Sequence, residues 1–139
     1  MDFHVGYSCK ARDLKVTLER AIELHRVDIS NLVIRSDNGP QMTSNQFNEY
    51  VKRIGLEHEF IPKKTPNKNA FIESFFSIYE IQFLQVRYFA SFKEAYDQTR
   101  EFIEFYNNER LHGSLGYRPP EEFERLFNQG ELEGKLVQC

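Results

Sequence analysis

The sequence predicts an α/β domain in which helices flank a small sheet. Strand-like and helix-like patterns alternate along the chain, which is the order that builds this fold class. Apolar residues recur every three or four positions in the helical stretches, whereas Leu32-Val33-Ile34 is a continuous apolar run, typical of a strand covered on both faces. With 139 residues, 40% of them hydrophobic, the chain has the length of one domain and can bury a sizeable core.

The first half of the chain predicts strands and helices in alternation. Residues 3–8 alternate weakly in polarity and predict a short strand. A helix follows over residues 13–26, with Asp13 suited to capping its start. Residues 31–36 predict the next strand, after which an Asn-Gly-Pro sequence breaks the chain.

A second helix is predicted over residues 43–54, and a third short strand over residues 57–61. Thr43 and Gln46 have the spacing of a capping box, and Gly55 suits the position just past the helix end.

The rest of the chain is mainly helical. Helices are predicted over residues 70–87 and 92–110, with Ser91 as the cap of the second, and a proline-led helix over residues 120–127 closes the fold. Three short strands make a small sheet, so the first strands of the complete sheet are expected to precede this segment.

Charge and composition limit the possible functions. The net charge of -3 and the pI of about 5.8 argue against a stand-alone nucleic-acid-binding module, because such modules must neutralise phosphates. A catalytic core that is held on DNA by another part of the protein remains compatible with this charge. No apolar stretch reaches the roughly 20 residues that span a bilayer, and no signal peptide is evident, so a cytoplasmic protein without a membrane partner is expected.

Two carboxylates stand in contexts that suit metal ligands. Asp37 directly follows the predicted buried strand, and Glu73 lies near the start of a predicted helix. Hard oxygen ligands of this kind hold Mg²⁺ in sites of phosphoryl transfer. Two other interpretations stay open, because Asp-Asn-Gly is also a common turn and a glutamate on a helix surface is ordinary.

Three motifs combine around these residues: RSDNGPQMTS at 35–44, NAFIESFF at 69–76 and FYNNERLHGSLGYRPP at 105–120. Together they resemble the catalytic core of bacterial insertion-sequence transposases of the retroviral-integrase type, and the resemblance extends over residues 5–123. It implies a ribonuclease-H-like fold, with a mixed sheet and flanking helices, that here lacks its first strands. Residues 1–127 would then be the C-terminal portion of the core, and residues 128–139 a tail.

The resemblance also implies a chemistry. The family carries an Asp-Asp-Glu triad that binds two Mg²⁺ or Mn²⁺ ions. Asp37 matches the second aspartate and Glu73 the glutamate, but no residue here matches the first aspartate. Asp2 lies in the wrong place for it. With two of three ligands, metal binding is expected to be weak or absent.

Contacts with DNA are a further implication. The candidates for contacting a DNA end are Lys63, Lys64, Asn67, Lys68 and Arg110. The alternatives are a solvated lysine loop and an Arg110 that fixes the following loop to the core. The scattered histidines His4, His25 and His58 receive no role.

The leading hypothesis is therefore part of a transposase core for metal-dependent DNA strand cleavage and strand transfer. Its expected partners are transposon ends and target DNA, further copies of the chain in a homo-oligomer, and a separate DNA-recognition domain or subunit. Because the first aspartate is missing, this chain alone is expected to be inactive or nearly so. The alternative is a non-catalytic transposase remnant that acts as an oligomerisation or interaction module, with exposed sheet edges for pairing.

Overall fold

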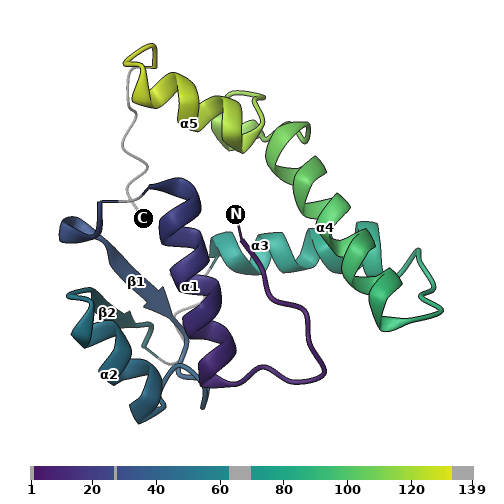
Figure 1. The fold of residues 1–139 in the computed structure, drawn as a ribbon. Coiled ribbons are helices and arrows are strands. Elements are labelled where there is room, and N and C mark those ends of the chain that lie inside the picture. Colours follow the sequence, from purple (N-terminus) through teal and green to yellow (C-terminus); the bar gives the residue numbers. More distant parts are fainter. Residues whose placement is uncertain (1, 27, 63–69, 133–139) are drawn as a thin grey trace. The chain divides into compact units, whose positions relative to one another are not determined.

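The computed structural model describes residues 2–26, 28–62 and 70–132 (Figure 1). These residues form two compact units, one from Asp2 to Tyr79 and the other from Glu80 onward. The first unit contains the sheet and three α-helices, and the second is helical. Within the described ranges, no helix is both long and apolar enough to cross a membrane.

The sheet of the first unit is a parallel pair of strands, β1 (Val33–Ser36) and β2 (Glu57–Phe60). Their register places Ile34 opposite His58 and Ser36 opposite Phe60. Both strands lie where the sequence predicts them. A parallel pair needs a crossover connection, which here contains helix α2 (Asn45–Arg53).

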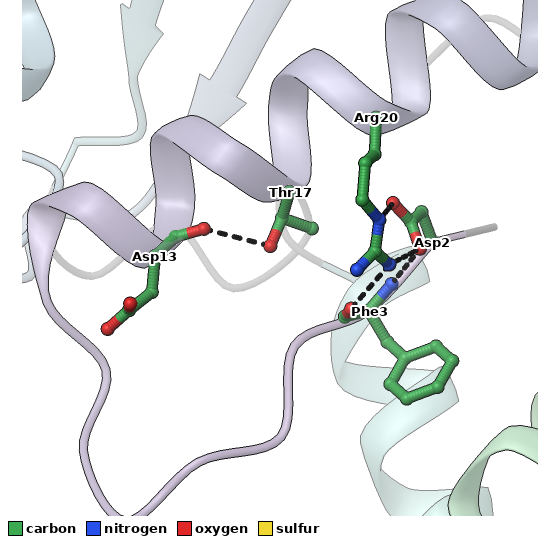
Figure 2. A network of polar contacts seen from close by, with 5 residues as sticks. All are labelled: Asp2, Phe3, Asp13, Thr17 and Arg20. Atoms are coloured by element: carbon green, nitrogen blue, oxygen red, sulfur yellow. Dashed lines mark hydrogen bonds and ion pairs between the residues drawn. The ribbon is translucent and has the colours of Figure 1, made fainter.

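The strand predicted over residues 3–8 is wrong, because this segment is irregular. An extended segment becomes a strand only when another strand pairs with its backbone, and here a side chain takes that role. Arg20 forms an ion pair with Asp2, and its Nη2 also donates to the carbonyl of Phe3 at 3.1 Å (Figure 2). The N-terminal segment is thus attached to a helix instead of to a sheet.

That helix, α1 (Ala11–His25), begins slightly earlier than predicted. The predicted capping role of Asp13 is confirmed, since its Oδ2 accepts the backbone N–H of Lys10 at 2.9 Å. The carbonyl of Asp13 also accepts the hydroxyl of Thr17 at 2.9 Å (Figure 2). The helix ends at Arg26, which adopts the left-handed conformation with φ 48°.

The core of the first unit lies between α1, α2 and the sheet. Its buried members come from α2 and the residues that follow it: Phe47, Tyr50, Val51 and Leu56. Half-buried apolar residues of α1 and β1 pack against them: Ala11, Leu14, Leu18, Ile22 and Ile34. The amphipathic spacing in the sequence therefore marked the inner faces of both helices.

The predicted helix over residues 70–87 is divided. Helix α3 (Ala70–Tyr79) belongs to the first unit, and a π-helical turn, η3 (Glu80–Leu84), opens the second. Phe83 in this turn is 1% exposed, and its ring centroid lies 5.1 Å from that of Phe102 and 5.7 Å from that of Phe89.

Two helices complete the second unit. Helix α4 (Phe92–Asn108) packs against α5 (Pro120–Asn128), and a short 3₁₀ turn, η4 (Gly113–Leu115), lies in the loop between them. The predicted cap of α4 is confirmed, because Ser91 Oγ accepts the N–H of Glu94 at 3.1 Å.

Candidate metal centre

Asp37 follows the last residue of β1 at the carboxyl end of the parallel pair. The ends of the two strands are tied together around it. The N–H of Ile61, just past β2, donates to the carbonyl of Ser36 at 2.8 Å. In return, Asn38 Nδ2 donates to the carbonyl of Ile61 at 2.7 Å. The residues on both sides of Asp37 are therefore fixed to Ile61, the residue that follows β2.

The Asp37 carboxylate is exposed and oriented by its own turn. Its Oδ1 accepts the backbone N–H of Gly39 at 2.9 Å, whereas Oδ2 has no hydrogen-bond partner among the described residues. A Cβ on residue 39 would lie 3.0 Å from this Oδ1, so only glycine leaves the carboxylate uncrowded. The turn interpretation and the metal-ligand interpretation are thus compatible, since one oxygen makes the turn and the other has no hydrogen-bond partner among the described residues.

The turn continues directly into α2. The carbonyl of Gly39 accepts two hydrogen bonds from Thr43, one from its backbone N–H at 3.0 Å and one from its side-chain hydroxyl at 3.1 Å. Ser44, rather than the predicted Thr43, is the helix cap, because its Oγ accepts the N–H of Phe47 at 3.3 Å. The segment between β1 and α2 is therefore held by successive local hydrogen bonds.

A series of polar contacts links the backbone of Asp37 to β2 and α2. The Ser36 hydroxyl donates to the carbonyl of Asp37 at 2.9 Å and lies 2.8 Å from Nε2 of His58 on β2. The other ring nitrogen of His58, Nδ1, lies 3.1 Å from the side-chain oxygen of Asn48 on α2. Burial lowers the pKa of His58 below its ordinary value of 6.5, which favours the neutral ring.

Glu73 is exposed in the first turn of α3, in the same compact unit as Asp37. A carboxylate in the first turn also interacts favourably with the helix dipole, so its position has a structural explanation as well. Among the described residues no three His, Cys, Asp or Glu side chains are grouped so that they could hold a metal ion. The convergence of Asp37 and Glu73 on one cation stays a prediction.

Asp2 is bound to Arg20 through both carboxylate oxygens, which agrees with its exclusion as a metal ligand (Figure 2). The chemistry of the two remaining candidates fits Mg²⁺ or Mn²⁺, since both are exposed carboxylates and Asp37 keeps one oxygen available.

The predicted DNA contacts fall in two places. Lys63, Lys64, Asn67 and Lys68 lie outside the described residues. Arg110 lies in the second unit, where its guanidinium carbon is 5.6 Å from the ring centroid of Tyr106. Its Nη1 lies 3.4 Å from both the carbonyl of Leu111 and Nδ1 of His112. These contacts favour a role in holding the loop after α4, and a phosphate contact stays a prediction.

The histidine beside Asp37 was missed by sequence reasoning. His58 carries no motif, and its nearest partners, Ser36 and Asn48, are 22 and 10 positions away in the chain. The register of β1 and β2 is the signal that finds it, because alternation places Ser36 and His58 on the same face of the pair.

Comparison with known proteins connects this geometry to a family. Residues 54–120 match the model of the integrase core domain. A 39.2 kDa uncharacterized protein of insertion element IS476 from Xanthomonas euvesicatoria is 37% identical over 90 residues, which cover 65% of this chain and 26% of that protein. The transposase for insertion sequence element IS904 from Lactococcus lactis is 30% identical over 95 residues, covering 68% of this chain and 38% of the transposase.

The chain thus spans roughly a quarter to two fifths of the length of these relatives. Its fold is similar to that of the HTLV-2 integrase catalytic core domain, solved in complex with magnesium, with a TM-score of 0.53 and 13% identity. The match covers 88% of this chain and 73% of the integrase chain. The predicted α/β class of the ribonuclease-H type is therefore confirmed, and the chain contains an integrase-like core of the kind found in insertion-sequence transposases.

Proposed function

We propose that the chain is part of a transposase catalytic core that supports metal-dependent cleavage and transfer of DNA strands. The observation that carries this proposal is the Asp37 turn, which fixes one carboxylate oxygen and leaves the other available at the carboxyl end of β1. Its support is the match of residues 54–120 to the integrase core domain and the likeness to transposases of insertion elements.

In this proposal Asp37 and Glu73 hold Mg²⁺ or Mn²⁺. A divalent cation bound there would supply stabilisation of the charge that develops on the attacking and leaving oxygens. Asp37 contributes an oriented oxygen from the strand end, and Glu73 contributes a second carboxylate from α3. The residues that would contact the phosphates of the DNA are Lys63, Lys64, Asn67, Lys68 and Arg110.

Two carboxylates form a weaker site than three. We therefore expect this chain by itself to bind the cation weakly and to show little or no strand transfer. Further copies of the chain and a separate DNA-recognition domain or subunit would complete the assembly on transposon ends and target DNA.

A Mn²⁺ titration followed by electron paramagnetic resonance tests the site. The unchanged chain should bind Mn²⁺, and both Asp37→Asn and Glu73→Gln should weaken binding at least about tenfold, because each removes an anionic ligand. Glu49→Gln is the matched control, since Glu49 is an exposed helical glutamate on α2. Equal effects of Glu49→Gln and Glu73→Gln would contradict the assignment of Glu73.

A strand-transfer assay with a pre-processed DNA end then tests the activity. Efficient strand transfer by the chain alone would contradict the expected deficiency. Restoration of strand transfer on adding a protein that supplies the first aspartate would support it.

The alternative function is a non-catalytic module that oligomerises with a transposase. The specific observation behind it is that, within the described part of the chain, β1 and β2 pair only with each other, so both keep an open edge. Sedimentation analysis distinguishes the two: self-association together with an absence of Mn²⁺ binding would favour the module, and Mn²⁺ binding that depends on Asp37 would favour the catalytic core.

A further inference from the structure

The backbone carbonyl of Asp37 is held by a buried hydroxyl group, that of Ser36. Ser36 is only 6% exposed, although it is polar, and it ends β1. Its single hydroxyl hydrogen is directed to the carbonyl of Asp37 at 2.9 Å, which fixes the peptide between Asp37 and Asn38. Buried hydroxyls need partners for their lone pairs as well, so the group that contacts Ser36 Oγ determines how firmly it is held.

That group is His58. Its Nε2 lies 2.8 Å from Ser36 Oγ. A ring with its hydrogen on Nδ1 alone would accept the Ser36 hydrogen, but when that hydrogen is directed to the Asp37 carbonyl, Nε2 of His58 carries a hydrogen and donates it to the hydroxyl oxygen. The two hydrogen bonds thus run in one direction, from His58 to Ser36 and from Ser36 to the Asp37 carbonyl.

The ring of His58 is itself held on several sides. Its Nδ1 lies 3.1 Å from Asn48 Oδ1. A ring that donates from Nε2 and is neutral has an acceptor at Nδ1, so the Asn48 amide must then be turned to place its nitrogen, rather than Oδ1, against the ring; a charged ring donates from Nδ1 to Oδ1 as the amide stands. Two aromatic neighbours restrict the ring further: Phe47 makes an edge contact with centroids 5.6 Å apart, and the Phe60 ring lies at 4.1 Å. The position of His58 is therefore set by both α2 and β2.

We propose that His58 is a positioning residue for Asp37, acting through the hydroxyl of Ser36. Groups that hydrogen-bond behind a metal ligand restrict its orientation before the metal binds. Loss of the His58 contact lets the Ser36 hydroxyl rotate away from the Asp37 carbonyl. The turn that presents the Asp37 carboxylate then loosens. The inference rests on the proposed function in one respect, namely that the carboxylate so presented binds a cation.

The Gly39 amide is the reporter of this effect, because its N–H donates to Asp37 Oδ1 and needs no metal to be observed. Its hydrogen-exchange rate is measured by NMR relative to the amides of α1. His58→Leu keeps the volume that packs on the neighbouring rings but removes the hydrogen bonds. It should accelerate exchange of Gly39 about fivefold, the effect of one lost hydrogen bond.

Two further variants separate positioning from packing. His58→Gln can place its Nε2 near the position of the ring Nε2, and it should restore slow exchange of Gly39. Val51→Ala perturbs the same core without touching the Ser36 hydroxyl, because Val51 is a buried apolar residue of α2. It should leave the Gly39 rate unchanged relative to α1. Where His58→Leu fails to fold, Ser36→Ala removes the same connection and should accelerate Gly39 equally.

The outcomes are distinct. Accelerated exchange in His58→Leu or Ser36→Ala, with rescue by His58→Gln, supports the positioning role. Unchanged exchange of Gly39 in the folded variants overturns it, as does an equal acceleration by Val51→Ala. Mn²⁺ affinity measured on the same samples tests the dependence on the proposed function. If Asp37→Asn leaves Mn²⁺ binding unchanged, the proposed function fails, whereas the exchange result judges the role of His58 by itself.

Discussion

Replacing Gly39 by alanine probes the Asp37 turn most directly. The added Cβ would lie 3.0 Å from Asp37 Oδ1 and 3.3 Å from Gln41 Oε1. Ordinary van der Waals contact begins near 3.4 Å. The carboxylate must therefore move by about 0.4 Å, which weakens the hydrogen bond that it accepts from the Gly39 N–H.

The two consequences of this substitution differ in size. Loss of one such hydrogen bond corresponds to about 1 kcal/mol, so Mn²⁺ binding should weaken roughly fivefold. The free energy of unfolding should change little, because alanine also restricts the unfolded chain and so offsets crowding by about 0.4–1 kcal/mol. Isothermal calorimetry with Mn²⁺ and urea unfolding measure the two effects on the same protein.

Two other glycines supply controls. Gly113 has open space around its Cβ position, so Gly113→Ala should raise the unfolding free energy by about 0.4–1 kcal/mol and leave Mn²⁺ binding unchanged. Gly55 has φ 81°, so Gly55→Ala should cost about 1–2 kcal/mol through backbone strain alone. Mn²⁺ binding by Gly39→Ala as tight as that of the unchanged chain, or equal weakening by Gly113→Ala, would contradict the role of the Asp37 turn in metal binding.

Three other predictions concern stability. Ser44→Ala should lower the unfolding free energy by about 1 kcal/mol in urea denaturation, because α2 loses its cap; an unchanged value would mean that the cap contributes nothing. Phe83→Ala should cost about 3–5 kcal/mol, since the side chain is 1% exposed, whereas Phe105→Ala at 43% exposure should cost much less, and similar losses would contradict the assigned core. Burial lowers the pKa of both His58 and His112 below 6.5, so the unfolded chain binds these protons first on acidification. Stability from this source is complete above pH 6.5 and should fall as the pH drops toward the lowered values. Urea unfolding from about pH 8 to pH 5 checks this, and His58→Gln should reduce the slope.

Local patterns predicted most helices and both observed strands. The caps at Asp13 and Ser91 and the glycine after α2 are set by hydrogen bonds within a few residues, so they can be read along the chain. Asp37 and Glu73 were likewise identified from motifs, and their local settings agree with the predicted strand end and helix start.

The errors arose where a distant partner decides the outcome. Residues 3–8 alternate as a strand would, yet the segment is attached to Arg20 of α1 and pairs with no strand in the described residues. The helical pattern continues past Tyr79, but the backbone widens into a π-helical turn from Glu80 to Leu84, where Phe83 packs among the rings of the second unit. Neither outcome has a local signature.

The sequence by itself determined the fold class, several helix ends and the candidate carboxylates, because periodic burial and capping depend on neighbours in the chain. The tertiary structure decided which side chains form the hydrogen-bonding contacts next to Asp37. The parallel register of β1 and β2 brings His58 to Ser36, and the packing of α2 brings Asn48 to His58. Such contacts depend on how strands pair and helices pack, and these choices are made by the whole chain.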